Sequence, residues 1–428
     1  MLNRPVLSWA FYDWANSAFA TTVIAGFFPV FFKQYWAAEQ AANESTFYLG
    51  LFNAIASLII VALAPLLGAM ADHLSQRKKF LFVFAMLGIL MTAGLSLVAQ
   101  GAWLTALLLY LFAVIGFSGS NIFYDALILN VTSLKKVDSV SSLGFAMGYL
   151  GGGILFAFNI VMVTWPQWFG LADASEAVKV SFVTVALWWT LFSVPIFLFV
   201  NEEPRSSSVQ VSALSAAYTN VILTLKQIMR LKTTFLFLVA YWFYIDGVDT
   251  IIRMAVDFGL SVGLDSNGLL AALLLTQFVG FPAALVFGKL GERKGPKFGI
   301  SLCLGVYVLI VLWAWQLSEQ WEFYLLAVAV GLVQGGIQSL SRSLYSRLVP
   351  VQQKAEFFGF YNMLGKFAAV IGPLLVGTIA LLTNDPRSGI LSVLLLFAIG
   401  GFLLAKVDVA KGTEDAASFI LKGAASIK

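Results

Sequence analysis

Long apolar segments recur along the whole chain, and they constrain its fold more than any other feature. Crossing a hydrocarbon core of about 30 Å takes about 20 apolar residues, and an α-helix satisfies its own backbone hydrogen bonds there. Twelve such runs can be placed along the sequence. They cover residues 8–32, 47–71, 80–99, 103–130, 142–164, 179–200, 233–256, 267–289, 298–317, 322–342, 357–381 and 389–405.

The composition leads to the same fold class. Of the 428 residues, 60% are hydrophobic and 11% are charged, whereas a soluble domain carries about 25% charged residues. The mean hydropathy is +0.88. We therefore predict an all-α membrane protein with twelve transmembrane helices.

The distribution of Lys and Arg predicts how the spans are oriented. When alternate loops are assigned to the cytoplasm, most basic residues fall on that side, and Arg342 is counted among them at the end of the tenth span. Four basic residues fall on the opposite side, namely Lys33, Lys179, Arg253 and Arg387. Because cytoplasmic loops are enriched in Lys and Arg, both termini are predicted to be cytoplasmic.

The chain divides into two similar halves. Residues 1–200 are predicted to form one bundle of six helices and residues 233–406 a second. Between them, residues 201–232 form a predicted cytoplasmic linker, and residues 407–428 form a cytoplasmic tail. Apolar residues at helical spacing within 212–230 predict an amphipathic helix on the inner membrane surface.

A short motif of a glycine, an acid and a basic residue appears once in each half. It consists of Gly68, Asp72 and Arg77 after the second span, and of Gly288, Glu292 and Arg293 after the eighth. The glycine lets two helices approach closely, and the acid accepts hydrogen bonds from a helix N-terminus or a basic neighbour. The motif resembles the cytoplasmic gate of major facilitator transporters, whose two halves are repeats around a site within the membrane. The alternative is an ordinary solvated loop.

Polar residues inside the spans are the candidate solute site. An Asp at the centre of a span costs about 2.5 to 3.5 kcal/mol, so such residues mark functional positions. They gather in the first, fourth, seventh and tenth spans, which line the central cavity of major facilitators. The candidates are Tyr12, Asp13 and Asn16; Asn121, Tyr124 and Asp125; Tyr244, Asp246, Asp249 and Arg253; Gln334 and Gln338; and Lys366 in the eleventh span.

The carboxylates among these residues have two interpretations. Asp13 and Asp125 lie toward the cytoplasmic end, where they either carry protons or only pair neighbouring helices. Asp246 lies deeper, which favours a coupling role, and Asp249 can pair with Arg253 one turn away. The fourth span contains no arginine, so the arginine relay of many proton-driven facilitators is absent and proton coupling stays open.

Several classes of function are excluded by the sequence. Cys303 is the only cysteine and His73 the only histidine, so cysteine zinc clusters cannot form and a Ser-His-Asp triad would have to use a histidine in a charged loop. The net charge of +4 is accounted for by the loops, which leaves no basic face for nucleic acid. We therefore expect no enzyme and no cofactor, with a proton or other ion gradient as the candidate energy source.

Glycines crowd the fifth span at positions 144, 148, 151, 152 and 153. Each lowers helix propensity by about 1 kcal/mol, so close packing against a partner helix is predicted there. In the second half, Gly372 of the eleventh span is the predicted counterpart of these glycines.

Four stretches, residues 12–19, 141–153, 331–343 and 355–373, resemble the vacuole-effluxer, autophagy-related branch of the major facilitators. The resemblance covers nearly the whole chain. It implies a twelve-span transporter, and fungal relatives are associated with amino-acid export from the vacuole.

Taken with the residues above, this predicts a secondary transporter in the cell membrane. We expect a monomer that exports a small polar solute, with amino acids as the favoured class. Two alternatives stay open: an exporter of amphipathic or drug-like compounds, and a receptor or scaffold that transports nothing.

Overall fold

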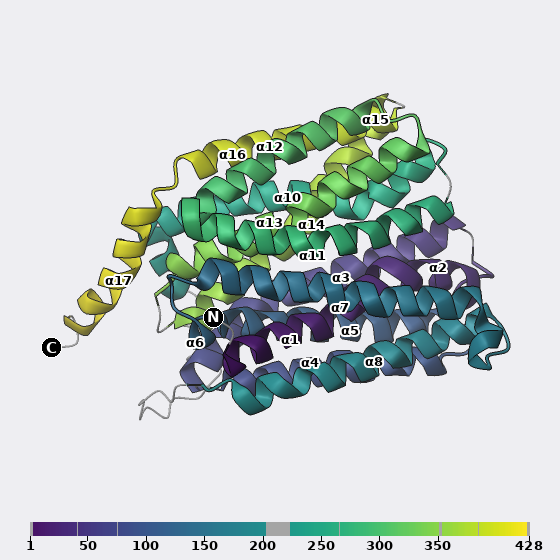
Figure 1. Cartoon of the computed structure of the whole chain (residues 1–428), viewed down its shortest axis with the longest axis horizontal. Helices are drawn as coiled ribbons and strands as arrows, with labels where there is room; N and C mark the ends of the chain where they lie inside the picture. Colours follow the sequence, from purple (N-terminus) through teal and green to yellow (C-terminus); the bar gives the residue numbers. More distant parts are fainter. Residues whose placement is uncertain are drawn as a thin grey trace.

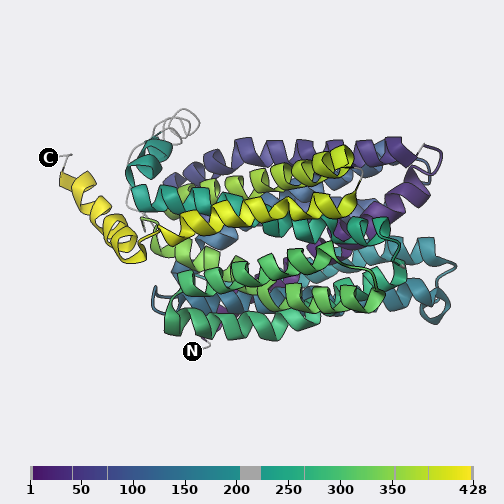
Figure 2. The same cartoon turned by 90° about the horizontal axis from the view of Figure 1, so that it is seen from above.

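The computed structural model describes residues 3–40, 42–74, 76–202, 223–264, 266–350, 353–383 and 385–425. Within these ranges the secondary structure is entirely helical. The long helices lie roughly parallel to one another, and α17 projects from one end of the bundle (Figures 1 and 2).

The first half begins with one long helical element. α1 (Arg4–Ala18) continues through the π-helical η1 (Phe19–Phe27), α2 (Phe28–Phe31) and η2 (Phe32–Trp36). The helices that follow are α3 (Ala42–Leu74), α4 (Arg77–Gly94), η3 (Leu95–Leu97), α5 (Trp103–Ala126), α6 (Ile128–Val131), α7 (Val137–Thr164), η4 (Pro166–Phe169) and α8 (Ala174–Phe199).

The second half repeats the pattern of long antiparallel helices. Its elements are α10 (Lys232–Ser261), α11 (Ser266–Lys294), α12 (Pro296–Trp315), α13 (Gln320–Arg347), α14 (Lys354–Thr383), α15 (Pro386–Leu391), α16 (Val393–Ala405) and α17 (Val409–Ala425). Of the predicted linker, residues 203–222 lie outside the described residues, and 223–230 are helical.

By length and composition, eleven helices in the described part of the chain could cross a membrane. Each of them corresponds to one predicted span, and only the eleventh predicted span, residues 357–381, has no counterpart among them. α14, a helix of 30 residues, covers that position, but its described apolar stretch is limited to Ile371–Ala380. The membrane class is thus confirmed, while the number twelve and the orientation of the termini stay predictions.

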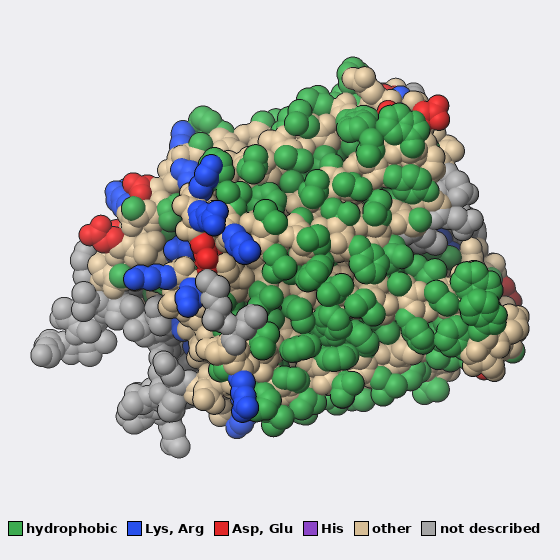
Figure 3. Space-filling model, viewed as in Figure 1, with side chains coloured by type: hydrophobic (Ala, Val, Ile, Leu, Met, Phe, Trp, Pro, Cys, Tyr) green, Lys and Arg blue, Asp and Glu red, His purple; other side chains and the backbone are tan. Residues whose placement is uncertain are grey.

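Both chain termini lie at the same end of the bundle (Figure 1). Lys and Arg side chains gather toward this end, whereas the flank of the bundle is covered by hydrophobic side chains (Figure 3). We call it the basic end: α4 begins at Arg77, α11 ends at Lys294, and Lys136 and Lys406 are the cap residues of α7 and α16.

Glycines allow the closest contacts between helices. A Cβ added to Gly148 would lie 2.5 Å from the Ser17 hydroxyl oxygen, and one added to Gly151 would lie 2.6 Å from the Trp14 carbonyl oxygen. The predicted packing role of the glycines in α7 is therefore confirmed: α1 and η1 are the partners of four of them, and Gly153 faces Gln277 of α11. Contacts between the halves join α3 to α14 and α7 to α11 and α13.

The predicted gate glycines lie at these contacts between the halves. A Cβ on Gly68 would collide with the carbonyl group of Ala355 in α14, and one on Gly288 would lie 2.7 Å from the Cβ of Ser142 in α7. Each motif therefore sits where a helix of one half meets a helix of the other.

Candidate functional site

A polar cavity of about 380 Å³ lies between the two halves. α1, α5 and α7 line it from the first half, and α10, α11, α13 and α14 line it from the second. Eight of the predicted site residues form part of its wall: Asp13, Asn16, Asn121, Tyr124, Asp125, Asp249, Gln334 and Gln338. The structure therefore brings together most of the polar residues that the sequence placed in four separate spans.

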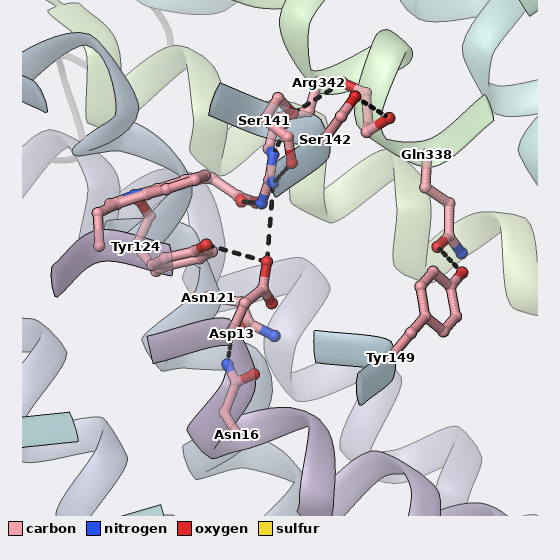
Figure 4. Close-up of polar contacts among 12 residues, drawn as sticks. Asp13, Asn16, Asn121, Tyr124, Ser141, Ser142, Tyr149, Gln338 and Arg342 are labelled. Carbon is pink, nitrogen blue, oxygen red and sulfur yellow. Dashed lines mark hydrogen bonds and ion pairs between the residues drawn. The ribbon is translucent and has the colours of Figure 1, made fainter. Parts of the chain in front are cut away.

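Arg342 of α13 is the centre of an ion network on this wall, and it is only 3% exposed. Its Nη1 donates to Oδ1 of Asp125 at 3.0 Å, and its Nη2 lies 3.7 Å from Oδ2 of Asp13. Its Nε donates to the hydroxyl of Ser141 at 2.9 Å, and Nη2 donates to the carbonyl of the same residue at 2.8 Å (Figure 4). One side chain of the second half is thereby bound to three helices of the first.

Aromatic and polar neighbours complete the network. The guanidinium carbon lies 4.4 Å from the ring centre of Phe145 and 4.8 Å from that of Trp9, which favours a cation. Tyr124 donates its hydroxyl to Asp13 at 2.9 Å, and Asn362 of α14 donates to Asp125 at 3.2 Å. Both carboxylates therefore have partners besides the arginine.

A second set of contacts lies nearer the basic end. Asp138 at the start of α7 is fully buried, accepts a hydrogen bond from Ser343 and pairs with Arg347. The hydroxyl of Ser142 donates to that of Ser339 at 2.9 Å. Together with the Arg342 network, these bonds hold the two halves in contact at the basic end of the cavity.

Four predicted cavity residues lie elsewhere, and this corrects the sequence interpretation. Asp246 is 1% exposed and accepts a hydrogen bond from the backbone N–H of Gly372 at 2.9 Å, so it faces α14 and not the cavity. Tyr244 is buried against Ser341, and its hydroxyl lies 2.7 Å from that of the serine.

The other two displaced residues have different surroundings. The ring of Tyr12 packs 5.1 Å from that of Tyr124, behind this wall residue, and does not itself line the cavity. Arg253 is exposed and is not among the residues that line the cavity.

The side chains of two other predicted residues, Asp72 and Lys366, lie outside the described residues. Glu292 and Arg293 are exposed at the end of α11.

Arg77, the basic residue of the first gate motif, begins α4. Its backbone N–H donates to the Glu202 side chain at 2.5 Å. This bond joins the start of α4 to the beginning of the predicted linker, just beyond the end of α8.

Sequence reasoning missed Arg342, the residue with the most contacts in the network. The sequence places it at the cytoplasmic end of the tenth span, but α13 continues to Arg347 and buries it. A signal was present: Gln334, Gln338 and Arg342 are spaced by four residues, so they share one helix face. The face that carried two predicted cavity residues carried the arginine as well.

An apolar chamber adjoins the polar cavity. Its volume is about 140 Å³, and α10, α11, α12 and α13 supply most of its wall. Four residues line both spaces: Ala25, Ile252, Gln277 and Gln334. A solute in the cavity therefore has an apolar space beside it.

Comparison with known proteins agrees with this architecture. The sequence matches the family described as vacuole effluxer Atg22 like over residues 35–417. The uncharacterized MFS-type transporter YxiO of Bacillus subtilis is 39% identical over 410 residues, which cover 95% of this chain and 95% of that protein. Autophagy-related protein 22 of Yarrowia lipolytica is 26% identical over 333 residues, covering 67% of this chain and 54% of the relative.

A solved structure shares the fold. The human organic anion transporter MFSD10 has a TM-score of 0.71 at 13% identity, over 94% of this chain and 99% of its own. At this level of identity the likeness concerns the fold alone. YxiO and this structural neighbour are described as transporters and not as enzymes, as the sequence predicted.

Proposed function

Because this chain belongs to the vacuole effluxer Atg22-like family of major facilitator transporters, we propose that it exports a small polar solute across the cell membrane by alternating access. Amino acids are the class that the family suggests. The observation that carries the proposal is the polar cavity between the halves, which Arg342 closes at the basic end by binding residues of the opposite half.

The ion network supplies a physical basis for opening and closing. When the halves separate at the basic end, Arg342 leaves Asp13 and Asp125, and two carboxylates lose their cation. Unpaired charge within the membrane is costly, so a proton or a cationic group of the solute would take the place of the arginine. With the basic end in the cytoplasm, this links solute entry to opening on that side.

Transport is tested by counterflow in proteoliposomes that contain the purified full chain. A panel of amino acids, sugars and amines is supplied with and without a pH gradient. At least one solute should exchange faster than in liposomes without protein. Absence of solute-dependent flux under every condition would contradict the transport proposal and favour a receptor or scaffold.

Coupling is tested with Asp125→Asn. This variant should lose flux driven by a pH gradient while it retains exchange of solute at equal pH, because the amide cannot take up a proton. Asp173→Asn, at the exposed N-cap of α8, is the matched control and should behave as the unmodified protein. Gradient-driven flux that survives in Asp125→Asn would remove this carboxylate from coupling.

A further inference from the structure

A groove between α4 and α8, outside the cavity, is charged at one end and apolar along the rest of its length. The two helices lie side by side at one edge of the bundle (Figure 1). The groove has a volume of about 660 Å³, and two lysines and five apolar side chains form its wall. The lysines, Lys78 and Lys79, directly follow the start of α4 at Arg77, so the charged end of the groove lies at the basic end of the bundle.

The apolar part of the groove is open along the flank of the bundle. Val83 is 61% exposed and Leu198 is 65% exposed, and both line the groove. The rings of Phe82 and Phe197 join the two helices in an edge-to-face contact, with their centres 5.6 Å apart. Because α4 and α8 are both candidate membrane spans, these exposed side chains lie where the acyl chains of lipids would contact them.

Lys78 fixes the charged end of the groove. Its Nζ donates to the carbonyl of Phe197 and to that of Val200, at 2.7 Å in each case. Carbonyls at the end of a helix have no partner within the helix, so this ammonium caps α8 from α4. Lys78 therefore holds the two helices together and is already engaged.

Lys79 differs from its neighbour, because its side chain is exposed. Among the described residues, no hydrogen bond or ion pair holds its ammonium. The backbone N–H groups at the start of α4 are occupied, since those of Arg77 and Lys78 donate to the Glu202 carboxylate at 2.5 and 3.3 Å. An anion at the groove would therefore meet the Lys79 ammonium and not the helix terminus, and three consecutive basic residues outweigh the one acid.

The order of charged and apolar residues matches the order of parts in a phospholipid. Lys79 lies at the start of the candidate span Arg77–Leu97, at the depth expected of lipid headgroups. Val83 follows about 6 Å deeper, since each residue of an α-helix rises 1.5 Å. A phosphate group at Lys79 would thus place the first methylene groups of its acyl chains beside Val83 and Leu198.

We propose that the groove between α4 and α8 binds one anionic phospholipid, with its phosphate at Lys79 and an acyl chain along the apolar wall. A lysine near the membrane surface favours an anionic over a zwitterionic headgroup, because the latter carries no net charge. This surface is separate from the cavity, so the inference goes beyond the proposed transport function and does not depend on it.

Three probes test the proposal on the purified full chain in a non-ionic detergent, with native mass spectrometry as the measurement. Dioleoyl phosphatidylglycerol should bind about fivefold more tightly than dioleoyl phosphatidylcholine, which corresponds to about 1 kcal/mol for one lysine. Glycerophosphoglycerol, the headgroup without chains, should not displace either lipid. Equal affinity for the two lipids would overturn the selection of an anion, and displacement by the headgroup alone would overturn the role of the apolar wall.

A lysine variant locates the phosphate. Lys79→Gln should remove the preference for phosphatidylglycerol and leave the affinity for phosphatidylcholine unchanged. Lys135→Gln is the matched control, because it removes the same charge from another exposed position, between α6 and α7, and it should keep the preference. A preference that survives in Lys79→Gln, or is lost equally in both variants, would overturn the assignment of the phosphate to Lys79.

A groove variant locates the acyl chain. Val83→Trp fills the groove and should weaken the binding of both lipids, whereas Val286→Trp, at a position of α11 that is 63% exposed, should change neither. If Val83→Trp fails to fold, Leu198→Trp repeats the test from α8. Phosphatidylglycerol with a photoreactive group near the top of one acyl chain should label residues 79–83 or 194–198. Labelling confined to other parts of the chain would overturn the proposed site.

Discussion

The first helix of each half carries a tyrosine and a nearby aspartate, but the two aspartates have different surroundings. Tyr12 of α1 packs on Tyr124 of α5, and Tyr244 of α10 contacts Ser341 of α13. Since α5 and α13 are the predicted fourth spans of their halves, the two tyrosines occupy equivalent places. Asp13 lines the cavity, whereas the second aspartate does not.

A difference of one residue accounts for this. Asp13 directly follows its tyrosine, while Ile245 separates Tyr244 from Asp246. One residue turns a helix position by about 100°, so Ile245 takes the cavity-facing place in α10. Asp246 is turned toward α14, just as Trp14 is turned toward α7.

The comparison separates an exchangeable contact from a fixed one. Asp13 and Asp125 share an arginine from the opposite half, so their partner leaves when the halves separate. Asp246 accepts from the backbone of a helix in its own half, so its partner stays. Carboxylates with similar sequence surroundings thus divide into a gate group and an anchor.

The largest expected effect is on the gate. Arg342→Ala leaves the buried Asp125 and the partly buried Asp13 without their cation, which should destabilise the closed basic end by about 3–5 kcal/mol. A Ser142→Cys reporter, in a Cys303→Ala background, should then react with a thiol reagent more than about a hundredfold faster. Arg253→Ala removes an exposed arginine and should leave the rate unchanged. Equal rates of thiol reaction in the Arg342→Ala and Arg253→Ala variants would show that Arg342 does not keep the basic end closed.

Next in size is the loss of one gate carboxylate. Asp125→Asn removes a charged hydrogen bond at 3.0 Å and should cost about 1.5–3 kcal/mol, measured with the same reporter. Asp13→Asn should cost less, because its carboxylate lies 3.7 Å from the guanidinium. The reverse order would show that Asp13 is the main partner of Arg342.

A comparable effect of a different kind is expected at the anchor. Asp246→Ala leaves the N–H of Gly372 without its acceptor and should lower the free energy of unfolding by about 1–3 kcal/mol. Denaturant unfolding in detergent measures it, with Glu414→Ala at an exposed position of α17 as control. If Asp246→Ala abolished coupled transport without lowering stability, Asp246 would instead have the coupling role that its predicted depth in the seventh span favours.

The smallest effects concern the polar residues that support the gate from either half. Ser141 of α7 binds Arg342, and Asn362 of α14 binds Asp125, so each half supplies a partner to the charge of the other. Ser141→Ala and Asn362→Ala should each weaken closure by about 0.5–1.5 kcal/mol in the reporter assay. A large effect of one substitution and no effect of the other would show that only one half contributes a supporting hydrogen bond to closure.

Features set by neighbouring residues were predictable. Each apolar run lies along its own helix, so the spans could be placed without knowledge of the fold. Close helix contacts were predictable from the glycines of α7 and from Gly68 and Gly288. Inside a span, a residue without a side chain mainly serves to let two helices approach each other. Asn121, Gln334 and Gln338 were assigned to the cavity for the same local reason, their polarity inside an apolar run.

The partners of those residues could not be predicted. Arg342 reads as a loop residue in sequence, since it stands at the end of an apolar run near other basic residues. Its burial depends on α1, α5 and α7, which are distant in the chain and meet it only after the halves have packed.

The sequence alone thus determined that the chain crosses a membrane, which helices carry polar groups, and which transporter branch it resembles. The tertiary structure decided which carboxylates face the cavity, which arginine closes it, and that an apolar chamber adjoins it. The physical reason is that hydropathy and helix spacing are properties of neighbouring residues. A cavity wall and an ion pair, by contrast, require helices from opposite halves to be placed and rotated against one another.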